Sequence, residues 1–349
     1  MTNIAILGFG VVGGGVYEVI SRASKAPLNE VNIKYILDLR SFPDHPLGDR
    51  VTTDFDKILA DDSVSVVVET MGGDGVAYKF SLAALKAGKN VVTSNKAVVD
   101  KYGKELEQAA KENGVVYLYE ASVGGGIPII APLNNCFMGD DILRVAGILN
   151  GTTNYILTHM QSEGKSLEEA LKIAQELGYA EADPHADLAG LDAARKIAIL
   201  AGIALDKYIS YTEIPYIEGI ENVTLEDIAL AEQLGCVIRL IAVAERVDGK
   251  ARVLVAPHLV GKDSLFSAIR EAFNAVSVTG SAVGEVVFYG QGAGSLPTAA
   301  AVCGDIERAI SGKARAHVRQ DCEPNFILDG SIGGKFVTLA NGKKYRYFE

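Results

Sequence analysis

The chain has 349 residues, of which 48% are hydrophobic and 22% are charged, and its formal net charge is −11. This length predicts two domains, and this composition is typical of a soluble globular enzyme. The acidic balance, without a dense basic patch, argues against a nucleic-acid partner. No apolar run is long enough to span a bilayer and no signal peptide opens the chain, so we expect a cytoplasmic protein that binds no membrane. The cysteines form no CxxC pair and are interpreted as reduced structural thiols: Cys136, Cys236, Cys303 and Cys322.

A dinucleotide-binding motif follows the first expected strand, Asn3–Leu7. The sequence GFGVVG places glycines at the three positions of G-x-G-x-x-G, between a strand and a helix. These glycines permit a tight turn, close approach of the backbone to a pyrophosphate, and close packing of helix on sheet. We therefore predict cofactor contacts along the motif, at Gly8, Phe9, Gly10, Val11, Val12 and Gly13.

The next expected strand, Val31–Leu37, ends at Asp38. An acidic residue at this point normally accepts hydrogen bonds from the adenosine ribose and favours NAD. Arg40 lies two residues further on and can instead meet the 2′-phosphate of NADP. The two residues point to different cofactors, so the choice between NAD and NADP stays open.

Apolar strands and helices then alternate. Strands are expected at Val64–Val68, Asn90–Thr93 and Val115–Tyr119, and helices at Val76–Ala87 and Lys101–Glu112. The alternation predicts a doubly wound, Rossmann-type parallel sheet, whose ligands bind at the carboxyl ends of its strands. The residues expected at that edge, toward the cofactor, are Thr70, Met71, Gly72, Thr93, Ser94 and Lys96.

The run Glu120–Pro128, EASVGGGIP, joins the two halves of the chain. Backbone carbonyls exposed by the glycines, together with the Glu120 carboxylate, are oxygen ligands of the kind that hard cations prefer. From the residues alone we favour a flexible crossover between domains, with Glu120 in a salt bridge.

The second half predicts an α+β domain in which helices pack on a largely antiparallel or mixed sheet. Helices are expected at Asn154–Gln161, Ser166–Leu177, Leu188–Ala204, Leu225–Leu234 and Ser264–Phe273. Strands are expected at Leu143–Leu149, at Val237–Val247 and Ala251–Val260 around the turn Asp248-Gly249, and at Ala275–Thr279 and Glu285–Tyr289. We divide the chain into a dinucleotide-binding domain (1–132), a substrate-binding, catalytic and dimerisation domain (133–295), a helix at about 296–312 that returns to the first domain, and a tail (313–349) with a hairpin.

Acidic residues gather ahead of a lysine in the stretch Gly178–Lys196. Asp192 and Lys196 are four residues apart and share one face of a helix. The apolar run IAILAGIAL follows, so the helix must be buried. A lysine at the mouth of a buried helix, facing an aspartate, suits proton transfer. The alternative is a solvated acidic loop before an ordinary helix, since acidic residues favour that end.

Together these motifs resemble the homoserine dehydrogenase family. The matching stretches run in family order over about residues 3–310: GFGVVGGG, VVTSNKA, EASVGGGIP, LNGTTNY, GYAEADP, DLAGLDAARK and FYGQGAGSLPTAAAVCGD. The resemblance implies NAD(P)-dependent interconversion of L-homoserine and L-aspartate 4-semialdehyde by a homodimer, in threonine, methionine and isoleucine biosynthesis.

The resemblance also implies residue roles. Lys196 matches the family's catalytic lysine, and Asp192 and Asp187 match its supporting aspartates. Glu181 matches a glutamate that holds homoserine, and Lys96 a lysine at the cofactor and substrate.

Two further implications follow from the resemblance. The Gly-rich junction becomes a structural sodium site, which reverses our interpretation from the residues alone; its ligands are the Glu120 side chain and the carbonyls of Val123, Gly125 and Ile127. Gly292, in GQGAG, joins the expected cofactor contacts. The stretch after Ile310 is short, so we expect no ACT regulatory domain. Nothing precedes the dinucleotide motif, so we expect no fused aspartate kinase.

Other functions remain open as alternatives. An aldehyde-oxidising, phosphorylating dehydrogenase needs a nucleophilic cysteine, for which only Cys136 is a candidate, and no basic residue follows it before Arg144. His185 can be a lactate-dehydrogenase-like base, although a surface histidine is the simpler interpretation. Another semialdehyde or amino-acid dehydrogenase is a third alternative. A silent dinucleotide-binding redox sensor is a fourth, and it needs no carboxylate–lysine cluster.

Overall fold

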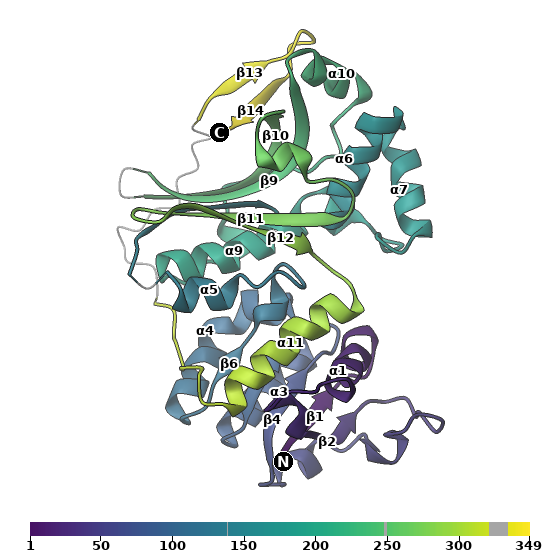
Figure 1. The fold of residues 1–349 in the computed structure, drawn as a ribbon, viewed down its shortest axis with the longest axis vertical. Coiled ribbons are helices and arrows are strands. Elements are labelled where there is room, and N and C mark those ends of the chain that lie inside the picture. Colours follow the sequence, from purple (N-terminus) through teal and green to yellow (C-terminus); the bar gives the residue numbers. More distant parts are fainter. Residues whose placement is uncertain (138, 248–249, 321–333) are drawn as a thin grey trace. The chain divides into compact units, whose positions relative to one another are not determined.

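The structure is a computed structural model that describes residues 1–137, 139–247, 250–320 and 334–349. The chain forms two compact units (Figure 1). Unit 1 comprises residues 1–130 and 293–320, and unit 2 comprises residues 131–292 together with the described part of 321–349. In the described ranges, no helix is long and apolar enough to cross a membrane. Cys322 and the Asp248-Gly249 turn lie outside the described residues.

Unit 1 is built on a six-stranded sheet whose strand order is β3-β2-β1-β4-β5-β6. The strands are β1 (Thr2–Leu7), β2 (Val31–Leu37), β3 (Val51–Thr52), β4 (Val64–Glu69), β5 (Asn90–Thr93) and β6 (Tyr117–Leu118). All neighbouring pairs are parallel. Val66, Val67 and Val68 of β4 are fully buried, because a parallel sheet with helices on both faces leaves neither face to water. The predicted doubly wound sheet is confirmed.

The helices of unit 1 include one segment that returns from the far end of the sequence. They are α1 (Val11–Ser21), α2 (Phe55–Leu59), α3 (Gly75–Lys86), α4 (Lys96–Glu112) and α11 (Ser295–Ile310), with short 3-10 turns η1 (Leu28–Glu30), η2 (Gly48–Arg50) and η3 (Glu120–Ser122). Helix α11 packs against α1. A Cβ at Gly15 would lie 2.8 Å from the Ser295 Oγ and 3.0 Å from the Ala299 Cβ, so glycine permits this close approach.

Unit 2 contains an eight-stranded mixed sheet with the order β12-β11-β7-β9-β10-β14-β13, and β8 also pairs with β10. The strands are β7 (Ile142–Ile148), β8 (Tyr216–Ile217), β9 (Cys236–Val247), β10 (Lys250–Gly261), β11 (Phe273–Gly280), β12 (Gly284–Gln291), β13 (Phe336–Thr338) and β14 (Lys344–Phe348). Strands β8 and β14 run parallel to β10, and the other pairs are antiparallel. The prediction of a largely antiparallel or mixed sheet is therefore confirmed.

Helices α6, α9 and α10 contact this sheet, and α7 packs on α6 (Figure 1). The helices of the unit are α6 (Gly151–Glu163), α7 (Leu167–Glu176), α8 (His185–Leu188), α9 (Leu191–Leu205) and α10 (Leu225–Gln233); α5 (Ile130–Asn135) begins at the boundary, and η4 (Tyr211–Glu213) and η5 (Leu265–Ala268) are 3-10 turns. The sheet's core includes Ile148, Ile241 and Val243, each at most 1% exposed.

Two predicted helices differ from the structure. The segment Ser264–Phe273 holds only the single turn η5 before β11 begins. The carbonyl of Ile269, which a helix would use internally, instead accepts from the buried side chains of Arg239 and Asn154. Tertiary hydrogen bonds have therefore overridden the local pattern. The helix expected at Leu188–Ala204 is interrupted at Gly190, whose φ of +79° ends one helical segment and starts the next.

Candidate functional site

Lys196 lies in the second turn of α9, inside a cluster of buried polar groups. Because the helix begins directly after Gly190, Asp192 and Lys196 fall one turn apart on the same face. The Lys196 Nζ lies 2.7 Å from the Asp192 Oδ2 and donates to the carbonyl oxygen of Leu149 at 2.7 Å. The lysine and aspartate side chains are 11% and 6% exposed. The ion pair is thus largely shielded from water.

Asn150 connects this ion pair to a second carboxylate. Its Nδ2 donates to the Asp187 Oδ1 at 2.6 Å and to the Asp192 Oδ2 at 2.8 Å. Its Oδ1 accepts from the backbone nitrogen and the hydroxyl of Thr153, at 2.8 and 2.9 Å. An amide group has two donor hydrogens and two acceptor lone pairs, and all four are used. The orientation of the amide is therefore fixed, since a flip would aim its oxygen at two carboxylates.

Asn150 was missed as a site residue in the sequence, where it appeared only within the matching stretch LNGTTNY. The available signal was its place before a helix, and Asn150 is indeed the N-cap of α6. That signal predicts a structural cap and gives no reason to expect contact with Asp192, which lies 42 residues away in the sequence.

Glu181 is not joined to the cluster by a direct contact. It lies in the loop between α7 and α8 and is exposed. Its main-chain oxygen accepts from the Gln175 Nε2 at 3.0 Å. The Thr152 hydroxyl, at the start of α6, donates to the Tyr179 carbonyl at 2.6 Å and holds this loop beside the cluster. The loop is therefore anchored near its beginning, while the Glu181 carboxylate faces solvent.

The glycine motif of unit 1 has the backbone geometry that a dinucleotide requires. Gly8 has a φ of +87°, and a Cβ at Gly13 would lie 2.2 Å from the Gly8 carbonyl oxygen, so both positions require glycine. A Cβ at Gly10 would meet no atom within 4 Å, so the space beside this glycine is open. These three roles, namely a turn, a close helix approach and room for a phosphate, fit a nicotinamide dinucleotide at the start of α1. Phe9, Val11 and Val12 belong to the same turn and helix start.

Asp38 and Arg40, expected to favour different cofactors, bind each other. The Arg40 Nε and Nη2 donate to the two Asp38 carboxylate oxygens at 2.9 and 2.8 Å. The Phe9 backbone nitrogen also donates to Asp38, at 2.7 Å. The hydrogen bonds from Arg40 hold the pKa of the Asp38 carboxyl far below its usual value. The Arg40 side chain is 61% exposed, and its guanidinium also lies over the Phe42 ring, 5.2 Å from the centroid.

The other residues expected at the cofactor edge surround a buried acid that was not predicted. Glu69, at the carboxyl end of β4, is fully buried and accepts from the Thr93 hydroxyl at 2.5 Å and the Met71 nitrogen at 2.8 Å. Burial raises the pKa of the Glu69 carboxyl. The Thr70 hydroxyl donates to the Gly8 carbonyl at 2.7 Å, linking this edge to the glycine turn. Gly72 and Ser94 flank these groups, and Lys96 is the first residue of α4. Gly292 lies in unit 2, where a Cβ would overlap the Asn274 side chain.

The Gly-rich junction folds around the Glu120 carboxylate. One oxygen of Glu120, which is 5% exposed, accepts from the backbone nitrogens of Ile129 and Ile130 at 2.6 and 2.8 Å. Gly124 and Gly125 have φ values of +75° and +54°, so the chain bends sharply after Glu120. A carboxylate together with backbone carbonyls is the kind of donor set that suits a hard cation. In the described part of the chain, no group of three or more His, Cys, Asp or Glu side chains can hold a metal.

Comparison with known proteins decides the family. The sequence model described as "Homoserine dehydrogenase" matches residues 128–306, and the model "Homoserine dehydrogenase, NAD binding domain" matches residues 8–120. The homoserine dehydrogenase of Synechocystis sp. is 44% identical over 314 residues, which cover 87% of this chain and 72% of that protein. The chain belongs to the homoserine dehydrogenase family. The Bacillus subtilis homoserine dehydrogenase is 43% identical over 311 residues, with the same shares of both chains covered.

Solved structures agree with this assignment. A homoserine dehydrogenase from Thiobacillus denitrificans superposes with a TM-score of 0.85 at 37% identity, over 91% of this chain and 77% of that one. A hyperthermophilic archaeal homoserine dehydrogenase in complex with NADPH superposes with a TM-score of 0.78 at 28% identity, over 90% and 99%. The chain is thus an NAD(P)-dependent oxidoreductase that interconverts L-homoserine and L-aspartate 4-semialdehyde.

Proposed function

We propose that Lys196 transfers the proton in this homoserine dehydrogenase reaction. The observation that carries the proposal is the largely shielded ammonium of Lys196, held between the Asp192 carboxylate and the Leu149 carbonyl. The bound nicotinamide supplies or accepts the hydride at the substrate carbon. In the reducing direction negative charge develops on the aldehyde oxygen, and the Lys196 ammonium stabilises that charge and donates a proton to it.

The carboxylates have complementary roles in this proposal. Asp192 keeps the Lys196 ammonium in place, and Asp187 shares the amide of Asn150 with it. L-homoserine carries an ammonium group, and Glu181 is the residue that we assign to bind it. This requires the exposed Glu181 side chain to turn toward the substrate. Cationic groups then face the developing oxyanion, and anionic groups face the amino group. Lys96 is assigned to the cofactor and substrate.

We further propose that either NAD or NADP serves as the cofactor, because Arg40 can exchange Asp38 for a 2′-phosphate. A sodium ion bound by Glu120 and the carbonyls of Val123, Gly125 and Ile127 would have a structural role. Its donor set contains no thiolate or imidazole, which argues against zinc. A homodimer is the proposed assembly.

The experiment that tests the assignment of Lys196 measures initial rates with homoserine and either cofactor. Lys196→Ala is expected to lower turnover about a hundred- to ten-thousandfold, the range typical of acid–base groups. Lys196→Arg is expected to be poor too, because a guanidinium does not release its proton near neutral pH. Cofactor affinity should change little. Lys172→Ala, at an exposed lysine of α7, is the control. If Lys196→Ala lowers the melting temperature but the folded enzyme turns over normally, Lys196 is a structural residue and the proposal fails.

A further inference from the structure

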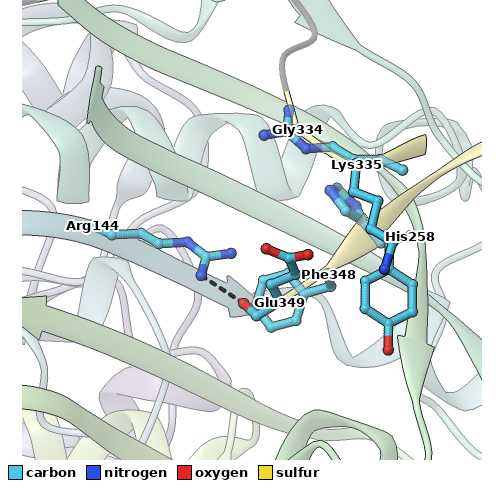
Figure 2. A pocket seen from close by; sticks show the side chains of 8 residues that line it. Arg144, His258, Gly334, Lys335, Phe348 and Glu349 are labelled. Carbon is cyan, nitrogen blue, oxygen red and sulfur yellow. Dashed lines mark hydrogen bonds between the residues drawn. The ribbon is translucent and has the colours of Figure 1, made fainter. Parts of the chain in front are cut away.

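A small cavity lies in unit 2 beside the paired strands β10 and β14 (Figure 2). Its volume is about 100 Å³, and its lining residues are Arg144, His258, Gly334, Lys335, Arg346, Tyr347, Phe348 and Glu349. Arg144 belongs to the first part of β7, whereas Asn150 follows the end of that strand. Six residues of extended chain separate the two by about 20 Å. The cavity is therefore distinct from the Lys196 cluster.

The lining of this cavity holds three cationic side chains, Arg144, Lys335 and Arg346, and one acidic residue, Glu349. A single carboxylate, Glu245, accepts from the Arg252 Nη1 at 2.9 Å and the Arg346 Nη2 at 3.2 Å, and lies 4.0 Å from the Arg144 Nε. Three guanidinium groups thus lie around the Glu245 carboxylate on one face of the sheet, and Glu349 is a second acid at the cavity. The Arg144 guanidinium also lies over the Phe348 ring, 4.6 Å from its centroid, and donates to a main-chain oxygen of Glu349 at 2.8 Å.

Three buried nitrogen atoms on the lining side chains have no hydrogen-bond partner among the described residues: the Arg144 Nε, the Arg346 Nη1 and the His258 Nε2. The last two belong to side chains that are more than nine-tenths buried. His258 and Arg346 are paired in the β10–β14 register, so both side chains project from the same face. Figure 2 shows His258 and Arg144 among the side chains that surround the cavity.

The nitrogens of Arg346 and His258 differ in what they offer to a ligand. The Arg346 Nη1 can only donate. The His258 Nδ1 lies 2.8 Å from the Ala256 carbonyl and must donate to it, since a carbonyl only accepts. Burial lowers the pKa of His258, and so do the positive charges of Arg346 and Arg144. The hydrogen bond to Ala256 raises it, and the resulting pKa is about 3. The ring is therefore neutral, and its Nε2 is a bare acceptor.

We propose that this cavity binds a hydrogen phosphate group, with Arg346 and Arg144 on its charged oxygens and the His258 Nε2 accepting from its hydroxyl. Phosphate has the required charge for the guanidinium groups. Unlike sulfate, it keeps a hydroxyl proton at neutral pH, and that proton satisfies the histidine acceptor. Gly334 (φ +103°) lets the chain pass close to the Arg346 guanidinium, because a Cβ there would lie 3.1 Å from the Nε. Lys335, at the exposed rim, adds a further positive charge.

Calorimetric titration of the full chain tests this site without using the enzymatic reaction. At pH 7.5 and matched ionic strength, inorganic phosphate is expected to bind once per chain, at least tenfold more tightly than sulfate. The difference arises because a sulfate oxygen facing the His258 Nε2 would bring two acceptors together. Equal affinity for the two anions, or no binding of phosphate at millimolar concentration, overturns the proposal.

Variants separate the two halves of the site. Arg346→Lys keeps a positive charge but loses the Nη1 donor, and should weaken both anions at least tenfold. His258→Leu should abolish only the preference for phosphate over sulfate. Lys344→Gln, at an exposed lysine of the same strand, should change neither affinity. A phosphate preference that survives in His258→Leu contradicts the proposal. The comparison in the wild-type chain remains decisive even if a variant does not fold.

Methyl phosphate identifies the source of the group. A phosphate monoester loses its last hydroxyl proton at about pH 6. If the site takes a phosphate monoester, methyl phosphate should bind as tightly as phosphate at pH 5.5 and weaken strongly at pH 8. If the site takes free phosphate, methyl phosphate should be excluded at both pH values while phosphate still binds. Methyl phosphate that binds equally at both pH values contradicts the role of the hydroxyl.

Discussion

Asn150 offers a direct test of how the buried carboxylates near Lys196 are organised. The residue has two roles that a substitution can separate: its Oδ1 caps α6, and its Nδ2 bridges Asp187 and Asp192. Asn150→Asp retains an acceptor for the cap, because aspartate is as good an N-cap as asparagine. It removes both donors and adds a third carboxylate. Asn150→Ala removes both roles.

The size of the effect follows from the two hydrogen bonds. Each bond joins a neutral donor to a charged acceptor, a type worth about 1.5–3 kcal/mol. If the geometry of the Asp192–Lys196 pair depends on both, the loss is about 3–6 kcal/mol of transition-state stabilisation. This corresponds to a decrease in kcat/KM of about a hundred- to ten-thousandfold. Asn150→Ala should also cost about 1 kcal/mol of stability through the lost cap, whereas Asn150→Asp should not lose that contribution.

The pH profile distinguishes a positioning role from a structural one. In Asn150→Asp, the two neighbouring carboxylates raise the pKa of the new carboxyl group. When that group is protonated, its hydroxyl can donate to one of the aspartates and partly replace the amide. The ratio of variant to wild-type kcat/KM for homoserine oxidation should therefore rise as the pH falls. Asn135→Asp, at an exposed asparagine of the same unit, should show no such trend.

The measurement is the initial rate of homoserine-dependent reduction of the cofactor from pH 6 to pH 9, with urea unfolding of each variant in parallel. Wild-type kcat/KM in Asn150→Asp at high pH would refute the reasoning. So would equal losses of stability and activity in the two variants at every pH, because Asn150 would then act only through the fold of α6.

Three further predictions concern other sites. Asp38→Ala should shift the ratio of kcat/KM values toward NADP, by removing charge that repels a 2′-phosphate; an unchanged ratio shows that Asp38 does not contact the ribose. His258 is neutral in the fold, with a pKa of about 3 against 6.5 for the free side chain. The stability that the neutral ring contributes to the fold is therefore fully present above pH 6.5 and is lost as the pH falls. At pH 5 this removes about 2 kcal/mol from the free energy of unfolding, a loss that urea titration at pH 7 and 5 should show in wild type and not in His258→Leu. If Glu120 binds sodium, the melting temperature should be higher in sodium than in lithium, and Glu120→Gln should reduce this difference. Equal differences in the wild type and the variant count against the ion site.

The fold of unit 1 could be predicted from the sequence because its signals are local. The three consecutive valines Val66, Val67 and Val68 place apolar side chains on both faces, which is typical of a strand covered on both sides of a sheet. The failure at Ser264–Phe273 shows where local signals end. There the chain is fixed by Arg239 and Asn154, two buried side chains from distant segments that bind its carbonyls. No pattern within ten residues encodes such a contact.

The same distinction applies to the candidate site. The spacing of Asp192 and Lys196 predicted their contact, because four residues make one helical turn. The Leu149 carbonyl and the Asn150 amide come from the end of β7, and only the tertiary fold brings them to α9. The sequence shows which side chains can react. It does not show which neutral groups hold those side chains in place.

The neutrality of Asn150 has a consequence for the charge of the site. Asp187 and Asp192 are two carboxylates that Asn150 bridges. A lysine or arginine at position 150 could also bridge both carboxylates, but it would add a positive charge between them. An amide supplies two donors without charge, so it holds the carboxylates together and leaves the charge of the cluster unchanged. In the proposed reaction the carboxylates then attract the ammonium group of homoserine while Lys196 still faces the oxygen. The residue at position 150 therefore has to be a donor that bridges both aspartates without changing the charge that binds the substrate.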